Sequence, residues 1–270
     1  MLLLAALFAT ATPAPSLTPA DIYRSALRRL TTLAQPRYID TTEHRIVVSE
    51  TPKGNIPAAW DERVLYDSAA RRECVMLLPY SDKSQVLFSQ AYFAPDMWSL
   101  RRPPAISSTP AHSEFEPDLS DLRTIAAIVA VAKPSYDITL AGINKLTNGG
   151  SAYHLVLKPL NDPTVHNLRE LWVDSVNFNI MRAVLAGSYA PEPGARVEPS
   201  TVTEDFGAVG PYWVVIHRAW TYRDMLSRIT MHLDSTETKM SFPREIPAWY
   251  FDQAQFDAHR SQVNPTSQWP

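Results

Sequence analysis

The side chains that could carry chemistry in this chain are its seven histidines, one cysteine and a short acidic cluster. The histidines show none of the H-x-H, H-x-x-x-H or H-E-x-x-H spacings of local metal sites. His217 and His232 lie on neighbouring predicted strands and could approach each other, but solvent-facing or structural roles are favoured. No G-x-S-x-G motif occurs, so the nucleophile elbow of a hydrolase is absent. The sequence therefore predicts no catalytic site, no metal site and no cofactor.

The cysteine and the acidic cluster also have structural interpretations. Cys74 lies in the apolar run Cys-Val-Met-Leu-Leu, which favours a buried, inert thiol over a nucleophile. Glu114, Glu116, Asp118 and Asp121 surround a predicted helix start, where carboxylates suit the helix dipole. General acid–base catalysis is the weaker interpretation of this cluster. We therefore expect a protein that is not an enzyme.

The composition excludes two large classes of binding protein. The net charge of −3 over 270 residues argues against the basic face that nucleic-acid binding needs. Glycine is scarce, with 8 residues where average usage gives about 19, and proline is abundant, with 23 where it gives about 14. Because a phosphate-cradling loop needs several glycines in one short span, a Rossmann or P-loop nucleotide site is excluded.

The N-terminus predicts export. Leu2–Phe8 is a short apolar run, and the small-residue pattern Ala9-Thr10-Ala11 follows it, as in a secretory signal. No Lys or Arg precedes the run, which departs from the usual signal. The run is too short to span a bilayer, so no transmembrane segment is expected. We predict that residues 1–11 are removed and that 12–270 form a single periplasmic or secreted domain.

Two helices are expected. Thr18 and Asp21 form a capping-box-like pair at the start of the first helix, and Pro36 stops it. The second is Asp118–Lys133, whose centre Ile125–Ala132 is apolar on every side. A surface helix would show a polar side, so we expect the flanking strands to wrap this helix.

Strand patterns fill most of the remaining chain. Tyr153–Pro159 and Arg169–Asp174 alternate with the period of two that a half-buried strand requires, with a turn sequence between them. Residues 95–117 form a proline-rich excursion, for which a lid or binding loop and a disordered insertion both stay open. Short links between strands favour an antiparallel meander. The predicted strands are Thr42–Ser49, Glu62–Tyr66, Cys74–Leu78, Val86–Phe93, Tyr136–Leu140, Ala152–Lys158, Leu168–Val173, Ile180–Leu185, Tyr212–Tyr222, Ile229–Leu233 and Lys239–Phe242.

Together these patterns resemble the LolA-like superfamily of periplasmic lipoprotein carriers and its outer-membrane lipoprotein-sorting relatives. The resemblance is carried by Tyr153–Pro159, Arg169–Asp174, Asn179–Arg182, the late strand with Phe242, and Ile246–Phe251. It implies an α+β fold in which a curved antiparallel β-sheet forms an open half-barrel with helices packed on the concave face. The proline-rich excursion departs from the carrier pattern.

The resemblance also implies a function, which is non-catalytic carriage of lipid, acyl chains or a lipidated protein in a hydrophobic cavity. Transient contact with envelope membrane proteins belongs to the same expectation. The alternative is an envelope scaffold or sensor module with a solid core and no cargo. The cavity is expected to be lined by the apolar faces of the second helix and of three strand sets, namely Ile125, Ile128, Val129, Tyr153, Leu155, Leu157, Leu171, Val173, Tyr212, Val214 and Ile216.

Overall fold

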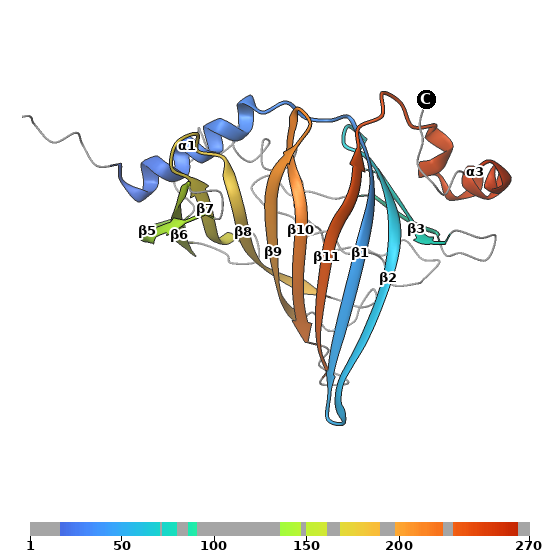
Figure 1. The fold of residues 1–270 in the computed structure, drawn as a ribbon, viewed down its shortest axis with the longest axis horizontal. Coiled ribbons are helices and arrows are strands. Elements are labelled where there is room, and N and C mark those ends of the chain that lie inside the picture. Colours follow the sequence, from blue (N-terminus) through green and yellow to red (C-terminus); the bar gives the residue numbers. More distant parts are fainter. Residues whose placement is uncertain are drawn as a thin grey trace, which may run out of the picture.

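One open antiparallel sheet of eleven strands dominates the part of the chain that the structure, a computed structural model, describes (Figure 1). The described residues are 17–70, 72–79, 86–90, 136–146, 150–160, 168–189, 198–223 and 229–263. The strands are β1 Tyr38–Thr51, β2 Gly54–Asp67, β3 Arg72–Leu78, β4 Val86–Gln90, β5 Tyr136–Lys145, β6 Ser151–Pro159, β7 Leu168–Asp174, β8 Ile180–Tyr189, β9 Glu198–Val209, β10 Tyr212–Arg223 and β11 Thr230–Ser241.

The sheet is a meander whose two halves join through its first and last strands. The strand order is β4-β3-β2-β1-β11-β10-β9-β8-β7-β6-β5. Every pair joins strands that follow each other in the chain, except that β1 pairs with β11. The two edge strands, β4 and β5, are therefore neighbours in sequence at opposite ends of the sheet. The curved, open sheet agrees with the predicted sheet architecture.

The first helix forms as its sequence predicts. Helix α1 spans Pro19–Thr32, and both hydrogen bonds of the capping box between Thr18 and Asp21 are present. Ile22, Ala26 and Leu30 are buried along one side of the helix. Through this side α1 packs mainly on β5, β6 and β7. We call the sheet face that α1 contacts the α1 face.

The pairing of residues between neighbouring strands shows which side chains lie on the α1 face. Leu171 pairs with Leu155 on one side and with Ala183 on the other, so the three side chains share the face. The same rule links Leu185 of β8 to Val47 of β1 through directly paired residues of the intervening strands, which are Val202, Trp220 and Leu233.

The C-terminal helices cover the opposite face. The 3₁₀ helix η1 (Ala248–Phe251), α3 (Gln253–Ala258) and the 3₁₀ helix η2 (Arg260–Gln262) follow the last strand. Ile246, Tyr250, Phe251 and Phe256 pack on Tyr38, Leu65, Cys74 and Met76, whose positions alternate with those of the α1 face. The described helices thus lie on both faces of the sheet, whereas the sequence placed helices on the concave face only.

The strand predictions were incomplete in three places. β9 was missed, since Glu198–Val209 holds threonines and carboxylates that do not read as a strand. β11 is one continuous strand where two were predicted, and β1 and β2 form a longer hairpin than expected. Residues 1–11 and 95–117 and the predicted helix Asp118–Lys133 lie outside the described residues, so those expectations stay predictions.

Candidate functional site

The α1 face holds a large buried set of apolar side chains, which we call the apolar cluster. It joins one side of α1 to residues of β5 to β10. Its fully buried members include Leu155, Leu157, Leu168, Leu171, Val173, Ile180, Ala183 and Leu185, and it continues through Val202, Phe206, Val214, Val215 and Trp220. The cluster therefore extends well beyond β5–β7, the strands on which α1 mainly packs.

Most of the predicted cavity residues that the structure describes come together in this cluster. Leu155, Leu157, Leu171 and Val173 are buried in it, as their alternation predicts. Tyr153 packs at its margin. Ile125, Ile128 and Val129 lie outside the described residues. The residues that alternation assigns to one side are thus on one side, and their role in binding a ligand stays a prediction.

The third predicted set, on β10, is split by an irregularity. A β-bulge between Val215 and His217 interrupts the alternation at Ile216. Val214 and Val215, which precede it, are both buried. Ile216 is 37% exposed and lies over Gly207 of β9, so it does not join the cluster. Tyr212 packs against the cluster, with its ring centroid 4.5 Å from that of Phe242.

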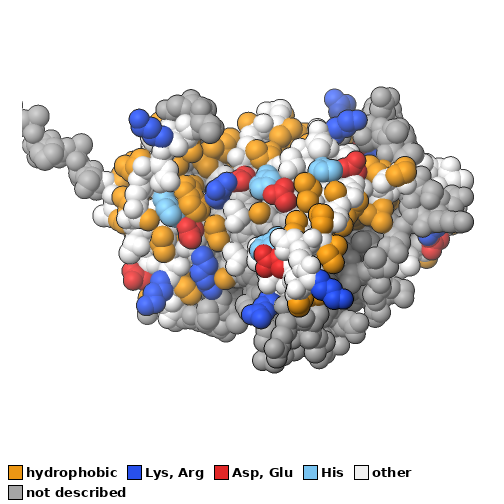
Figure 2. Space-filling view, turned by 60° about the horizontal axis from the view of Figure 1, so that its bottom comes forward, with side chains coloured by type: hydrophobic (Ala, Val, Ile, Leu, Met, Phe, Trp, Pro, Cys, Tyr) orange, Lys and Arg blue, Asp and Glu red, His pale blue; other side chains and the backbone are white. Residues whose placement is uncertain are grey.

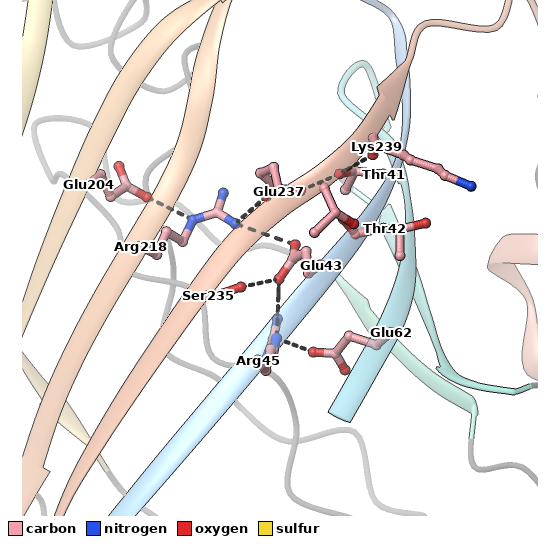
Figure 3. Close-up of polar contacts among 11 residues, drawn as sticks. Thr41, Thr42, Glu43, Arg45, Glu62, Glu204, Arg218, Ser235, Glu237 and Lys239 are labelled. Atoms are coloured by element: carbon pink, nitrogen blue, oxygen red, sulfur yellow. Dashed lines mark hydrogen bonds and ion pairs between the residues drawn. The ribbon is translucent and has the colours of Figure 1, made fainter. Parts of the chain in front are cut away.

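A network of charged side chains interrupts the apolar α1 face, and Figure 3 shows its contacts. We call this network the polar belt. It crosses β9, β10, β11, β1 and β2 at one level of the sheet, where directly paired positions carry polar groups. Its members are Thr41, Glu43, Arg45, Glu62, Glu204, Arg218, Ser235 and Glu237.

Two guanidinium groups organise the belt. Arg218 lies 3.1 Å from Glu204, 3.5 Å from Glu237 and 3.6 Å from Glu43. Arg45 lies 2.8 Å from Glu43 and also pairs with Glu62. The Ser235 hydroxyl donates to Glu43 at 2.8 Å, and Thr41 donates to Glu237. All these groups are largely buried, and Arg218 is the most accessible, with 17% of its side chain exposed.

Glu43 and Glu62 share the guanidinium of Arg45, yet their pKa values shift in opposite directions. Burial acts to raise the pKa of Glu43, but the charges of Arg45 and Arg218 and the Ser235 hydroxyl outweigh it and lower that pKa to about 2. Burial raises the pKa of Glu62 to about 7, because Arg45 offsets it only in part and Glu43 and Glu73 repel a second charge. Glu62 is therefore a member of the belt that exchanges a proton near neutral pH.

The belt lies between apolar layers on the strands that carry it. On β9 and β10, Phe206 and Val215 pair on one side of it, and Val202 pairs with Trp220 on the other. A polar patch inside an apolar surface suits a ligand with both a polar and an apolar part. Buried charge clusters also occur in active sites. In the described belt, however, the contacts join carboxylates to guanidinium and hydroxyl groups, an arrangement that positions charge and supplies no activated nucleophile.

The opposite face carries a second polar row. Arg182 binds Asp205 through two hydrogen bonds of 2.5 and 2.9 Å, and its guanidinium lies over the Trp172 ring at 5.7 Å. His217 contacts both Asp205 and Asp234, and His44 lies 2.7 Å from Asp61. In Figure 2, histidine side chains adjoin acidic and basic ones in a row across the exposed surface. This row is partly solvent-exposed, unlike the belt.

The other candidate residues that the structure describes have the following contacts, and the acidic cluster Glu114–Asp121 lies outside the described residues. His217 and His232 lie on neighbouring strands, but each is paired with a threonine in the register and bound to carboxylates of its own. Cys74 is buried, which raises the pKa of its thiol, as the inert interpretation requires. Among the residues that the structure describes, no group of three or more His, Cys, Asp or Glu side chains is placed to hold a metal ion. No helix within the described ranges is long and apolar enough to cross a bilayer.

Sequence reasoning missed the belt because its residues read as a solvated strand face. In β1 the side chains of Glu43, Arg45 and Val47 point to one face of the sheet, and that of Ile46 points to the other. The apolar run Ile46-Val47-Val48 suggests that these residues are the buried part of β1. In the structure, however, Ile46 is 40% exposed, and Glu43 and Arg45 are buried. The signal that could have revealed the belt is the opposite charge of residues that face each other on neighbouring strands. That signal can be recognised only once the register of β1 against β11 is known.

Comparisons with known proteins give distant structural similarities. No protein family matches the chain, and no curated protein matches it significantly. A DUF1329 family protein from Desulfovibrio piger aligns over 88% of this chain and 99% of its own, with 10% identity and a TM-score of 0.40. A LolA superfamily protein from Nitrosomonas europaea aligns over the same shares, with 16% identity and a TM-score of 0.38.

A domain from Vibrio parahaemolyticus named for outer membrane lipoprotein sorting aligns over 88% of this chain and 97% of its own, with 11% identity and a TM-score of 0.41. A LolA superfamily structure is thus among those to which the chain is similar. At these identities and TM-scores, function has to be argued from the residues of this chain.

Proposed function

We propose that this protein binds lipid, acyl chains or a lipidated protein on the α1 face of its sheet, without chemical change to the cargo. The observation that carries the proposal is the extent of the apolar cluster beyond α1. A helix with its side chains is about 10 Å across, which matches roughly two strand spacings. The apolar cluster reaches from β5 to β10, and α1 packs mainly on β5–β7.

The surface beyond α1 suits an exchangeable cover. Val202, Phe206 and Trp220 are buried there without strong packing from α1. Burial stabilises such side chains by about 25 cal/mol per Å² of apolar area, and an acyl chain supplies the same contact as a protein side chain. A cargo that replaces one apolar cover by another therefore binds with a small net change in buried area.

The polar belt gives the proposed site an orientation. Arg218 borders the apolar layer of Val202 and Trp220 and is the most accessible charged group of the belt. A few polar groups within an apolar pocket fix the direction in which a ligand enters. We place the polar end of the cargo near Arg218 and its apolar chain along Trp220 and Leu233, which are paired across β10 and β11.

The remaining parts of the proposal come from the sequence. Ile125, Ile128 and Val129 join the proposed lining because the predicted helix Asp118–Lys133 has no polar side. Leu2–Phe8 and the small residues after it support export, and so a periplasmic or secreted site of action. A carrier in that compartment would make transient contacts with envelope membrane proteins.

A fluorescent fatty acid whose emission rises in an apolar environment tests the proposal. We expect saturable binding to the purified chain and displacement by phospholipid or by a lipopeptide. Leu233→Ser, on the α1 face, should weaken binding at least tenfold, because a Leu side chain that a ligand buries fully contributes about 1.5–3 kcal/mol. Val48→Ser is the matched control, since Val48 is half-buried one register position away and points to the opposite face.

Two outcomes would overturn the proposal. The first is the absence of probe binding at any protein concentration, which would favour the scaffold or sensor module. The second is an equal effect of Leu233→Ser and Val48→Ser, which would place any bound probe elsewhere than the α1 face. Circular dichroism of both variants checks that they are folded.

A further inference from the structure

The polar row on the opposite face contains one histidine held between two carboxylates. His217 Nδ1 lies 3.0 Å from Asp205 Oδ2 on β9, and its Nε2 lies 2.9 Å from Asp234 Oδ2 on β11. The imidazole on β10 thus reaches the strand on either side. The His217 side chain is 29% exposed, so protons from solvent can reach it.

The two contacts require a particular protonation state. A neutral imidazole carries one N–H and can donate to only one carboxylate, while its other nitrogen presents a lone pair to the second. An imidazolium donates at both nitrogens. We propose that His217 is a pH-dependent clamp that, in its protonated form, ties β9 to β11 across β10. This inference does not depend on the proposed lipid binding.

The charges that face His217 favour the closed clamp. Asp205 contributes from β9 and Asp234 from β11, and the positive Arg182 on β8 binds Asp205. Thr236, the cross-strand partner of His217 on β11, is uncharged, and His44 beyond it is paired with Asp61. Burial acts to lower the pKa of His217, but the hydrogen bonds and charges of Asp234 and Asp205 outweigh it, so that the pKa is raised above 6.5.

The clamp stands directly behind the polar belt. Asp205, His217 and Asp234 are each adjacent in sequence to a belt residue, namely Glu204, Arg218 and Ser235. Successive strand residues point to opposite faces, so the same three strands are cross-linked at one level on both faces. When His217 loses its proton it can donate to only one of the two carboxylates, so its tie between β9 and β11 is broken while the belt contacts on the other face remain. The clamp thus places a pH-sensitive link directly behind Arg218.

The sign of the pH dependence follows from the raised pKa. Stability from the clamp is fully present below the unfolded-state pKa of about 6.5 and is lost as the pH rises through the higher folded-state pKa. Nitrogen-15 NMR of the histidines in the full chain measures this directly. We expect His217 to be protonated at both nitrogens at pH 6.5, with a titration midpoint above that pH.

Two matched substitutions separate the clamp from general surface electrostatics. Asp234→Asn should lower the titration midpoint of His217 by about one pH unit, because it removes one of the two carboxylates that contact the imidazole. Asp61→Asn removes a carboxylate of similar exposure on the same face, two strands further away and bound to His44, and should leave His217 unchanged. A His217 midpoint at or below 6.5 in the unaltered protein, or an equal shift in both variants, would overturn the inference.

Discussion

The apolar cluster and the polar belt lie on the same face of one sheet and are both largely buried, but the first consists of apolar side chains and the second of charged and polar ones. In the cluster, Leu171 packs between Leu155 and Ala183 on the neighbouring strands. In the belt, Arg218 lies between Glu204 and Ser235 at equivalent paired positions. Both regions obey the alternation of strand side chains. Alternation therefore determines which side chains face inward, and the partner strand determines whether they can be charged.

The two regions also differ in what they tolerate. Apolar side chains in a core can be replaced by others of similar volume at modest cost. A buried ion pair is different, because removing one partner leaves an uncompensated charge in a low-dielectric environment. Substitutions in the two regions test whether this difference holds here, and the largest effect is expected in the belt.

Arg45→Met should be the most destabilising of the substitutions considered. It removes the guanidinium that Glu43 and Glu62 share and leaves both carboxylates buried. We expect a loss of about 3–5 kcal/mol in the free energy of unfolding, measured by urea denaturation near pH 7. Arg24→Met is the control, since Arg24 forms an exposed pair with Asp21 on α1 and should leave the midpoint nearly unchanged. Equal midpoints for the two variants would show that the belt is not electrostatically coupled.

Part of this architecture was predictable from the sequence. The capping box at Thr18 and the alternation around Leu155 and Leu171 are local signals, and the structure confirms both. β9 and the burial of Glu43 depend on pairing between residues far apart in the chain. A strand with charge on one face reads as solvent-exposed until the opposite charge of its neighbour is known.

The bulge in β10 was also not predictable from the local sequence. The sequence pattern placed Tyr212, Val214 and Ile216 on one face, but the extra residue between Val215 and His217 shifts the phase. Nothing in Val-Val-Ile marks that insertion, because all three residues are equally suited to a strand. The C-terminal helices were missed for a different reason, since α3 spans only Gln253–Ala258.

Leu171→Ala probes the apolar side of the comparison. Leu171 is fully buried at the centre of the cluster, so its truncation loses transfer free energy and leaves a cavity. We expect the free energy of unfolding to fall by about 3 kcal/mol in chemical denaturation. Val156→Ala, on the adjacent strand and facing the opposite side, should change it by less than about 0.5 kcal/mol. A small effect at Leu171 would mean that the cluster relaxes readily around a lost side chain.

Glu62→Gln tests whether Glu62 is protonated in the folded state near neutral pH. Burial raises the pKa of Glu62 to about 7 from 4.5, so the folded state retains a proton that the unfolded state releases. Stability therefore falls as the pH rises from about 4.5 to about 7 and then levels off. Because Gln resembles the protonated acid, the variant should lack this decline and be more stable than the unaltered protein at pH 8, by roughly 3 kcal/mol. Parallel pH profiles for the two proteins would contradict the assignment to Glu62.

Thr18→Ala should have the smallest effect, and it tests how firmly α1 belongs to the apolar cluster. Thr18 Oγ1 accepts a hydrogen bond from the Asp21 amide, and loss of such a cap costs about 1 kcal/mol. Since Ile22, Ala26 and Leu30 are buried together with Leu155, we expect this loss in the global unfolding free energy. Thr31→Ala, in the exposed last turn, serves as the control. If hydrogen exchange shows α1 opening in Thr18→Ala while the global midpoint is unchanged, then α1 unfolds separately from the sheet. The helix would then itself be an exchangeable cover of the α1 face.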